Sequence, residues 1–374
     1  MKIPRYFQRL DSYLKPNKVL VIYGPRQVGK TTLLTDYLQK TKLKYRLDSG
    51  EDVRIQEILE SHDFRKIRDY ARGYELLAID EAQKIHCVGD CLKIIVDQIP
   101  GIYVIATGSS SFDLAGQVGE PLTGRKITLI LYPVAQMELQ ELYTPFEMRE
   151  RLEEFLIFGS YPEVAAEADM KEKARILTEI TSSYLLKDIL VLDRVKSSKI
   201  LLDLLRLLAF QIGSEVSLSE IAQKIGIDYK TVARYIDLLE KNFVLFMLRG
   251  YSRNLRNEMT KKAKYYFFDT GIRNALLANF NPPELRNDIG MLWENFLVME
   301  RQKKQSYKAV SVNSYFWRTW QQKEIDLIEE RQGRLFAYEF KWSGGAREPK
   351  SFRKAYPDAE FNVVNQENYL EFIT

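Results

Sequence analysis

The stretch KVLVIYGPRQVGKTTLL, residues 18–34, decides the fold. Its segment 24–31 fits the pattern GxxxxGK[ST], with an apolar run before it and a helix-forming run after it. Glycines let the backbone curl so that N–H groups point into the loop, and the amino terminus of a helix adds positive potential. The stretch therefore predicts a phosphate-binding loop between a strand and a helix. Its predicted phosphate contacts are Gly24, Pro25, Arg26, Gln27, Val28, Gly29, Lys30, Thr31 and Thr32.

Short apolar runs bounded by turn residues continue around this loop, from residue 17 to about residue 135. They are KVLVIY, KYRLD, ELLAIDEA, IYVIATG and ITLILYP, and they alternate with longer amphipathic segments. Strands that alternate with helices in this way are typical of an α/β fold with a parallel sheet.

The run LLAIDE ends in two carboxylates, Asp80 and Glu81. An acidic residue at this place can bind the Mg²⁺ shell, and a second one can polarise a water that attacks a γ-phosphate. We expect the hydroxyl of Thr31 to be a further Mg²⁺ ligand and Lys30 to reach the outer phosphates. The sequence thus predicts ATP and Mg²⁺ as cofactors.

With these motifs the sequence resembles the additional-strand class of P-loop ATPases, and within it the AAA type. The resemblance implies that IYVIATGSS is the strand between the loop strand and the Asp-Glu strand, ending in a sensor of the γ-phosphate. Thr107 and Ser109 are the candidates, although turn or capping hydroxyls explain them equally well. The resemblance also gives Arg125 the task of completing a neighbouring subunit's site in a homo-oligomer. A solvated surface arginine is the alternative.

Composition limits the other possibilities. Of the 374 residues, 45% are apolar and 28% are charged, which indicates packed domains rather than a disordered chain. A net charge of +4 is too small to indicate a polyanionic partner by itself. Apolar runs fall short of the roughly 18 residues of a membrane helix, and the amino terminus lacks a signal-peptide core. We expect a cytoplasmic protein without a membrane segment.

The pattern divides the chain into four parts: an ATPase core (1–145), a helical subdomain (146–212), a winged helix (213–255) and a terminal α/β domain (256–374). In the third part, Ser217 and Glu220 fit a capping box and Gly226 fits a helix end. A second helix and the run FVLFMLRGYSR then complete the spacing of a winged helix. We find no internal repeat.

A recognition helix contacts DNA or RNA through its early residues, and a basic stretch after it suits a phosphate backbone. The candidates are Lys230, Thr231, Arg234, Arg253, Lys261 and Lys262. Winged helices also act as lids and protein contacts, so a role without nucleic acid is equally open.

The terminal part carries Glu294 on a predicted helix, Asp326 on a strand, and Glu339 and Lys341 on the next strand. This order is the PD-(D/E)xK nuclease pattern. Alternate residues of a strand share a face, so a metal-binding carboxylate and a cation that can activate water become neighbours. An ordinary salt bridge on a strand is the alternative, and a nuclease-like fold does not establish activity.

The motifs GPRQVGKTTLL, LLAIDEAQ, ATGSS, LTGR, FGSYPEV, YYFFDTG, WENF, EIDL and EFKWS together resemble a prokaryotic family of AAA-type ATPases with a carboxyl-terminal domain of unknown function. The resemblance implies an ATPase core, a winged helix and a restriction-endonuclease-like domain. The leading hypothesis is a Mg²⁺-dependent ATPase coupled to a DNA-binding winged helix and a nuclease-like domain. The alternative is a slow ATPase switch that acts on a protein partner and whose nuclease-like domain is inactive.

Overall fold

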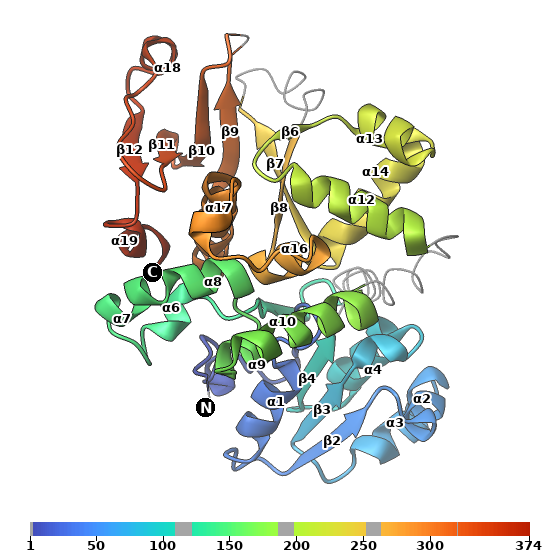
Figure 1. Ribbon diagram of the computed structural model, residues 1–374. Helices are drawn as coiled ribbons and strands as arrows, with labels where there is room; N and C mark the ends of the chain where they lie inside the picture. The colour runs from blue at the N-terminus through green and yellow to red at the C-terminus, as the bar shows by residue number, and fades with distance from the viewer. Residues whose placement is uncertain (1–2, 109–121, 186–197, 252–262, 320) are drawn as a thin grey trace. The chain divides into compact units, whose positions relative to one another are not determined.

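The computed structural model describes residues 3–108, 122–185, 198–251, 263–319 and 321–374. It contains two compact units (Figure 1). The amino-terminal unit consists of residues 4–133 and 241–243, and the carboxyl-terminal unit of residues 134–240 and 244–374 together with Ile3. No helix within the described ranges is long and apolar enough to cross a bilayer.

A five-stranded sheet forms the amino-terminal unit, in the order β2-β3-β4-β1-β5 and with every pair parallel. Its strands are β1 (Val19–Tyr23), β2 (Tyr45–Ser49), β3 (Leu76–Asp80), β4 (Tyr103–Gly108) and β5 (Lys126–Ile130). All of β1 is apolar and buried, as a central parallel strand requires. The predicted parallel α/β core is confirmed, and β4 lies between β1 and β3 as the resemblance implied.

Helices connect these strands. They are α1 (Lys30–Leu38), α2 (Val53–Glu60), α3 (Phe64–Ala71) and α4 (Val88–Gln98), with short 3₁₀ turns at Leu10–Ser12 and Ala82–Lys84. Asp52 and Asp63 cap α2 and α3 because each carboxylate accepts a bond from an N–H group of the first turn. Since β1 ends at Tyr23 and α1 begins at Lys30, the phosphate loop lies at the carboxyl ends of the strands.

The carboxyl-terminal unit begins with helices. They are α6 (Gln136–Leu139), α7 (Pro145–Glu150), α8 (Leu152–Phe158), α9 (Pro162–Ala166), α10 (Met170–Glu179), a π-helical turn (Ile180–Leu185), α12 (Ser198–Phe210), α13 (Leu218–Ile225) and α14 (Tyr229–Lys241). The caps of α13 agree with the sequence: Ser217 accepts a bond from the N–H of Glu220, and Gly226 ends the helix at φ 71°. Asp228 caps α14 through the N–H of Thr231 at 2.9 Å.

One seven-stranded mixed sheet completes this unit, in the order β12-β11-β10-β9-β7-β8-β6 (Figure 1). Its strands are β6 (Glu215–Val216), β7 (Leu245–Gly250), β8 (Ala263–Phe267), β9 (Asn313–Arg318), β10 (Glu324–Arg331), β11 (Arg334–Phe340) and β12 (Glu360–Val364). Its remaining helices are α16 (Thr270–Leu276), α17 (Ile289–Tyr307), α18 (Lys350–Ala355) and α19 (Tyr369–Ile373), with a 3₁₀ turn at Pro283–Leu285.

The strands of the expected winged helix therefore share a sheet with those of the expected terminal domain, because β7 pairs in parallel with β9. The division of the chain into four parts remains a prediction within this two-unit arrangement.

Candidate functional site

The phosphate loop has a backbone that requires its glycines. Gly24 has φ 153°, and a Cβ atom there would lie 1.9 Å from the carbonyl oxygen of Leu131, in the segment that follows β5. Gly29 caps α1 at φ 89°. A side chain at Gly24 would clash with Leu131, and a side chain at either glycine would strain the backbone because φ is positive.

Lys30 lies inside this loop. Its side chain is 5% exposed, and its Nζ atom donates to the carbonyl oxygens of Gly24 at 2.8 Å and Pro25 at 2.6 Å. The loop thus holds a desolvated ammonium group against its own backbone. An anion at the loop would find this charge next to the amino terminus of α1.

A hydrogen-bonded chain joins the ends of three structural elements beside the loop. Thr31, on α1, donates from Oγ1 to Asp80 Oδ2 at 2.8 Å. Thr107, on β4, donates from its hydroxyl to the other Asp80 oxygen, and accepts a bond from the backbone N–H of Glu81 at 3.2 Å. The neighbouring positions of β3 and β4 in the sheet bring Asp80 and Thr107 together.

Glu81 follows β3 in a left-handed conformation, with φ 51° and ψ 40°. This conformation is uncommon for a residue with a side chain. Oε2 of Glu81 accepts a hydrogen bond from Gln83 Nε2 at 2.5 Å. Gly50 makes room for the turn, because a Cβ atom there would lie 2.4 Å from the carbonyl oxygen of Glu81.

The oxygens at this place fit Mg²⁺. The ion prefers oxygen ligands and is usually held by one or two carboxylates together with substrate phosphates. Asp80 supplies the carboxylate and Thr31 the hydroxyl, and the two already touch. The structure thus brings together the predicted residues Lys30, Thr31, Asp80, Glu81 and Thr107.

Arg5 is part of the site that sequence analysis missed. Its guanidinium donates to the carbonyl oxygen of Val28, in the loop, and to that of Tyr132 at 2.6 Å, and the residue is only 9% exposed. Arg5 therefore fixes the outer side of the phosphate loop to the segment after β5. These contacts span 23 and 127 residues, so no local pattern could indicate them.

Arg125 lies elsewhere in the amino-terminal unit. It precedes β5, at the amino ends of the parallel strands, where its Nε atom pairs with Asp97 at 2.6 Å. The phosphate loop of the same chain is at the opposite ends of these strands. Ser109, the other sensor candidate, lies outside the described residues.

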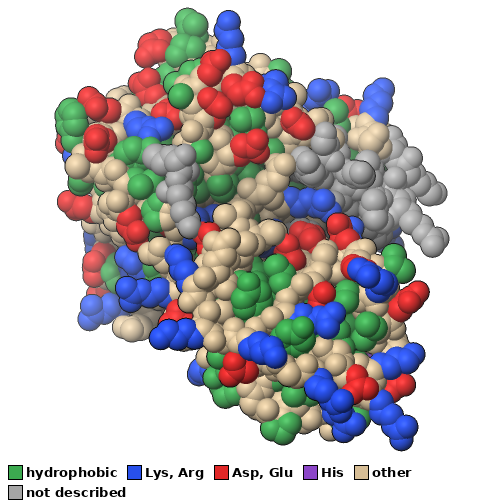
Figure 2. Space-filling view, turned by 90° about the horizontal axis from the view of Figure 1, so that it is seen from below, with side chains coloured by type: hydrophobic (Ala, Val, Ile, Leu, Met, Phe, Trp, Pro, Cys, Tyr) green, Lys and Arg blue, Asp and Glu red, His purple; other side chains and the backbone are tan. Residues whose placement is uncertain are grey.

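The predicted nucleic-acid contacts are only partly described. Lys230 and Arg234 are exposed on α14, whereas Thr231 binds Asp228 through its hydroxyl at 2.5 Å as part of the helix cap. Arg253, Lys261 and Lys262 lie outside the described residues. On the face in Figure 2, charged side chains of both signs are interspersed rather than gathered by sign.

The predicted nuclease residues lie together in the carboxyl-terminal unit. Lys341 Nζ is 2.7 Å from Glu339 Oε1, and Asp326 Oδ2 accepts a bond from the N–H of Phe340 at 2.7 Å. Burial, then the charges of Glu294 and Glu339, raise the pKa of Asp326 well above its ordinary value. We call Glu294, Glu324, Asp326 and Glu339 the carboxylate cluster.

The cluster also contains a lysine that no sequence motif placed there. Lys264, on β8, is 1% exposed, lies 2.8 Å from Glu294 Oε1 and also pairs with Glu324. Burial lowers the pKa of Lys264, but Glu294 and Glu324 outweigh burial and raise that pKa above its ordinary value. Among the described residues, no three His, Cys, Asp or Glu side chains are placed to hold one metal ion.

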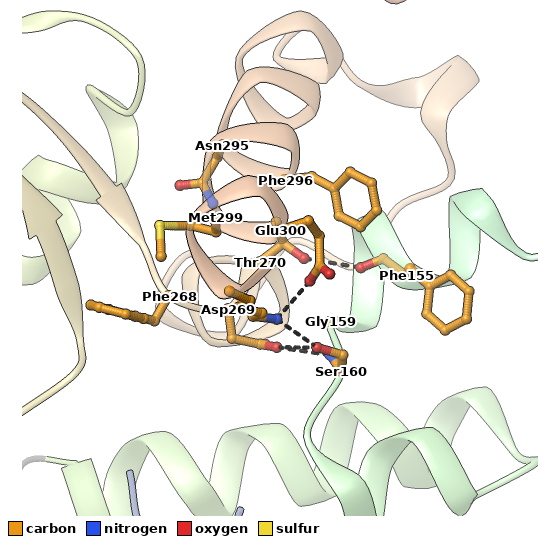
Figure 3. Close-up of a pocket in the computed structure, with 11 residues that line it drawn as sticks. Phe155, Gly159, Ser160, Phe268, Asp269, Thr270, Asn295, Phe296, Met299 and Glu300 are labelled. Atoms are coloured by element: carbon orange, nitrogen blue, oxygen red, sulfur yellow. Dashed lines mark hydrogen bonds and ion pairs between the residues drawn. The ribbon is translucent and has the colours of Figure 1, made fainter. Parts of the chain in front are cut away.

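Three of the other sequence motifs meet at a buried pocket (Figure 3). Gly159, of FGSYPEV, has φ 68°, and a Cβ atom there would lie 2.0 Å from Asp269 Oδ1, of YYFFDTG. Asn295, of WENF, exchanges hydrogen bonds of 2.7 and 2.9 Å with the backbone of Phe267. Asp269 Oδ2 accepts a bond from the N–H of Ser160 at 2.7 Å. These motifs therefore have a packing role.

Comparison with known families divides the chain in three. Residues 16–140 match the family described as AAA domain. Residues 149–283 and 289–372 match two families described as Domain of unknown function, DUF8612 and DUF4143. The parallel sheet, its strand order and the phosphate loop agree with the first match. The amino-terminal unit thus has the fold of a P-loop ATPase core and is similar in sequence to the AAA domain family.

Curated relatives are similar over almost the whole chain. Uncharacterized protein Rv2008c of Mycobacterium tuberculosis is 26% identical over 361 residues, which cover 94% of this chain and 76% of the relative. Uncharacterized protein MJ1544 of Methanocaldococcus jannaschii is 25% identical over 378 residues, covering 95% and 82%. A solved structure, the Walker-type ATPase PABY2304 of Pyrococcus abyssi, has a TM-score of 0.49 at 18% identity and covers 73% of this chain and 94% of that one.

Proposed function

We propose that the amino-terminal unit binds ATP with Mg²⁺ and hydrolyses it. The observation that carries this proposal is the chain of hydrogen bonds from Thr31 through Asp80 to Thr107 and the backbone of Glu81. It supplies, beside a phosphate loop, a hydroxyl and a carboxylate for a metal and a second carboxylate for a water.

Each residue then has a role. Lys30 exchanges its bonds to the loop carbonyls for bonds to phosphate oxygens, and Thr31 and Asp80 hold Mg²⁺. Bound Mg²⁺ neutralises the charge that develops on the phosphates. Glu81 orients the attacking water, and Thr107, which contacts both Asp80 and Glu81, senses the γ-phosphate. Arg5 positions the loop through the carbonyl oxygen of Val28.

ATP turnover by purified full-length protein tests this proposal. We expect turnover in the wild type and its loss in Lys30→Ala and Glu81→Gln. Lys40→Ala, which removes an exposed lysine just after α1, is the matched control and should behave as the wild type. Equal turnover in Lys30→Ala and the wild type would refute the proposed role of the loop.

We further propose that the nucleotide state controls the carboxyl-terminal unit, as a switch. The relatives align over both units, which supports a function that needs the two together. We do not propose that the carboxyl-terminal unit cuts nucleic acid, because Lys264 already neutralises part of the negative charge of the carboxylate cluster.

Nucleic-acid binding by α14 is the second candidate function. Lys230 and Arg234 are exposed on α14, while Val232, Tyr235 and Ile236 of the same helix are buried, so its polar face is open for a groove. Duplex DNA, single-stranded DNA and RNA should each be tested for binding at several salt concentrations. If α14 binds one of them, Lys230→Ala with Arg234→Ala should reduce the salt dependence by about two counterions. Binding that is unchanged in this double variant would eliminate the candidate.

A further inference from the structure

The carboxylate cluster contains a lysine where a divalent metal would be expected. Lys264 and Tyr266 alternate on β8, so both side chains point to one face of the sheet. Lys264 Nζ is 2.8 Å from Glu294 Oε1, and the Tyr266 hydroxyl donates to the same oxygen at 2.6 Å. Lys264 also pairs with Glu324, on β10. One ammonium group thus joins the helix carboxylate to a carboxylate of the sheet.

Glu294 has little space to turn away from this lysine. A Cβ atom at Gly213 would lie 3.0 Å from Glu294 Oε2, so the carboxylate is enclosed on that side as well. Its side chain is 13% exposed and that of Lys264 1%. A buried lysine that lost its partner would be an uncompensated charge, which is strongly unfavourable. The pair is therefore fixed in place.

The other members of the cluster also have partners within the protein. Glu339 pairs with Lys341 at 2.7 Å, Asp326 accepts the N–H of Phe340, and Glu324 has a second cation in Arg318 at 3.5 Å. One buried oxygen, Glu339 Oε2, has no hydrogen-bond partner among the described residues. Glu294 Oε1, Glu324 and Glu339 Oε1 are thus already engaged by lysine ammonium groups of the protein.

We infer that Lys264 is the resident cation of the carboxylate cluster and takes the electrostatic place of a divalent metal there. A metal ion that entered between Glu294 and the strand carboxylates would have to compete with an ammonium group that cannot leave. The carboxyl-terminal unit then keeps the arrangement of a PD-(D/E)xK centre without its metal chemistry.

Direct metal binding tests this inference independently of ATP turnover. Full-length protein without nucleotide is titrated with Mn²⁺, and bound Mn²⁺ is measured by electron paramagnetic resonance. Every sample carries Asp80→Asn, which removes the metal carboxylate of the phosphate-loop site. We expect this background protein to bind no more Mn²⁺ than the same protein with Asp326→Asn.

Removal of the lysine should create a metal site. Lys264→Met leaves carboxylates without their cation, so Mn²⁺ affinity should rise by at least about tenfold, and Asp326→Asn should reverse the gain. Lys173→Met is the matched control, because Lys173 is also 1% exposed and pairs with Glu154 at the same 2.8 Å, on other elements. It should gain no Mn²⁺.

Stoichiometric Mn²⁺ in the background protein that Asp326→Asn or Glu339→Gln abolishes would overturn the inference. This arm needs no change at Lys264, so it decides the matter even where Lys264→Met does not fold. Lys264→Arg, which keeps a cation at the position, should bind as little Mn²⁺ as the background protein. A gain of Mn²⁺ in Lys264→Arg as large as in Lys264→Met would also contradict it.

Discussion

Thr31 donates its hydroxyl hydrogen to Asp80 at 2.8 Å, and this bond joins the helix that follows the phosphate loop to the end of the neighbouring acidic strand. The two residues are 49 positions apart in the sequence. They meet because β1 and β3 are parallel and flank β4, so that their carboxyl ends lie at one edge of the sheet. Strand order thus brings together the two residues that we propose to bind the metal.

Thr31→Ala should weaken the use of Mg²⁺. Without the hydroxyl, Asp80 keeps only its side-chain bond from Thr107 among the described residues, and the metal loses one ligand. The Mg²⁺ concentration for half-maximal ATP hydrolysis should rise by at least about tenfold. Thr35→Ala, one turn further along α1, should leave it unchanged. A Mg²⁺ titration that is the same for Thr31→Ala and the wild type would remove Thr31 from the site.

Gly24→Ala should destabilise the amino-terminal unit. The added Cβ atom would lie 1.9 Å from a backbone oxygen, at φ 153°. We expect the free energy of unfolding to fall by more than about 3 kcal/mol, as measured by urea denaturation. Gly101→Ala is the control for backbone strain alone. Gly101 also has a positive φ, of 79°, but a Cβ atom there would have no neighbour within 4 Å. It should cost about 1 kcal/mol. Equal losses would show that the contact with Leu131 does not matter.

We expect any contribution of Arg125 to ATP hydrolysis to be made at the site of a neighbouring copy of the chain. Arg125→Ala would then lower turnover by about a thousandfold. Addition of Glu81→Gln protein, which has no working site but keeps Arg125, should restore part of the turnover. Asp97→Ala breaks the same ion pair and keeps the arginine, so it should retain turnover. Identical behaviour of Arg125→Ala and Asp97→Ala would mean that the residues form only a surface ion pair.

Lys304 should make stability depend on pH. Burial, then the nearby charge of Arg301, lowers the pKa of Lys304 to about 8 from 10.5. Below pH 8 the lysine is charged in both the folded and the unfolded state. The folded state then carries the full free-energy cost of a partly buried charge. Between pH 8 and 10.5 the folded state loses its proton first, and the free energy of unfolding rises.

Lys304→Met should therefore be more stable than the wild type at pH 7, and this advantage should shrink toward pH 10.5. Urea denaturation at several pH values measures it. Lys350→Met, at an exposed lysine, should show no such trend. An advantage that grows with pH would have the wrong sign for this explanation.

Local patterns in the sequence predicted the strands of the amino-terminal unit and the caps at Ser217 and Gly226, because hydrophobic alternation and capping act within a few residues. The place of β4 came from the family resemblance. The contacts of Arg5 and Lys264 were missed for the opposite reason. Arg5 contacts carbonyl oxygens, which every residue has. Lys264 ends the basic stretch that was predicted to suit a phosphate backbone, and it lies on β8 instead. Nothing local indicates either partner.

The glycine of FGSYPEV is a further case in which the local sequence does not reveal a long-range contact. The motif was visible in the sequence, but its need for a glycine comes from Asp269, 110 residues later, which occupies the space of a Cβ atom. Likewise, the pairing of β7 with β9, which joins two predicted domains in one sheet, depends on contacts that no single stretch determines.

The identity of the nucleotide retained by the protein tests the central claim, hydrolysis of ATP at the Thr31–Asp80–Glu81 site, most directly. Wild type, Glu81→Gln and Lys30→Ala are incubated with ATP and Mg²⁺, separated from free nucleotide, denatured and analysed by ion-exchange chromatography. We predict ADP on the wild type, intact ATP on Glu81→Gln and no nucleotide on Lys30→Ala. ADP on Glu81→Gln in the same amount as on the wild type would contradict the proposed mechanism.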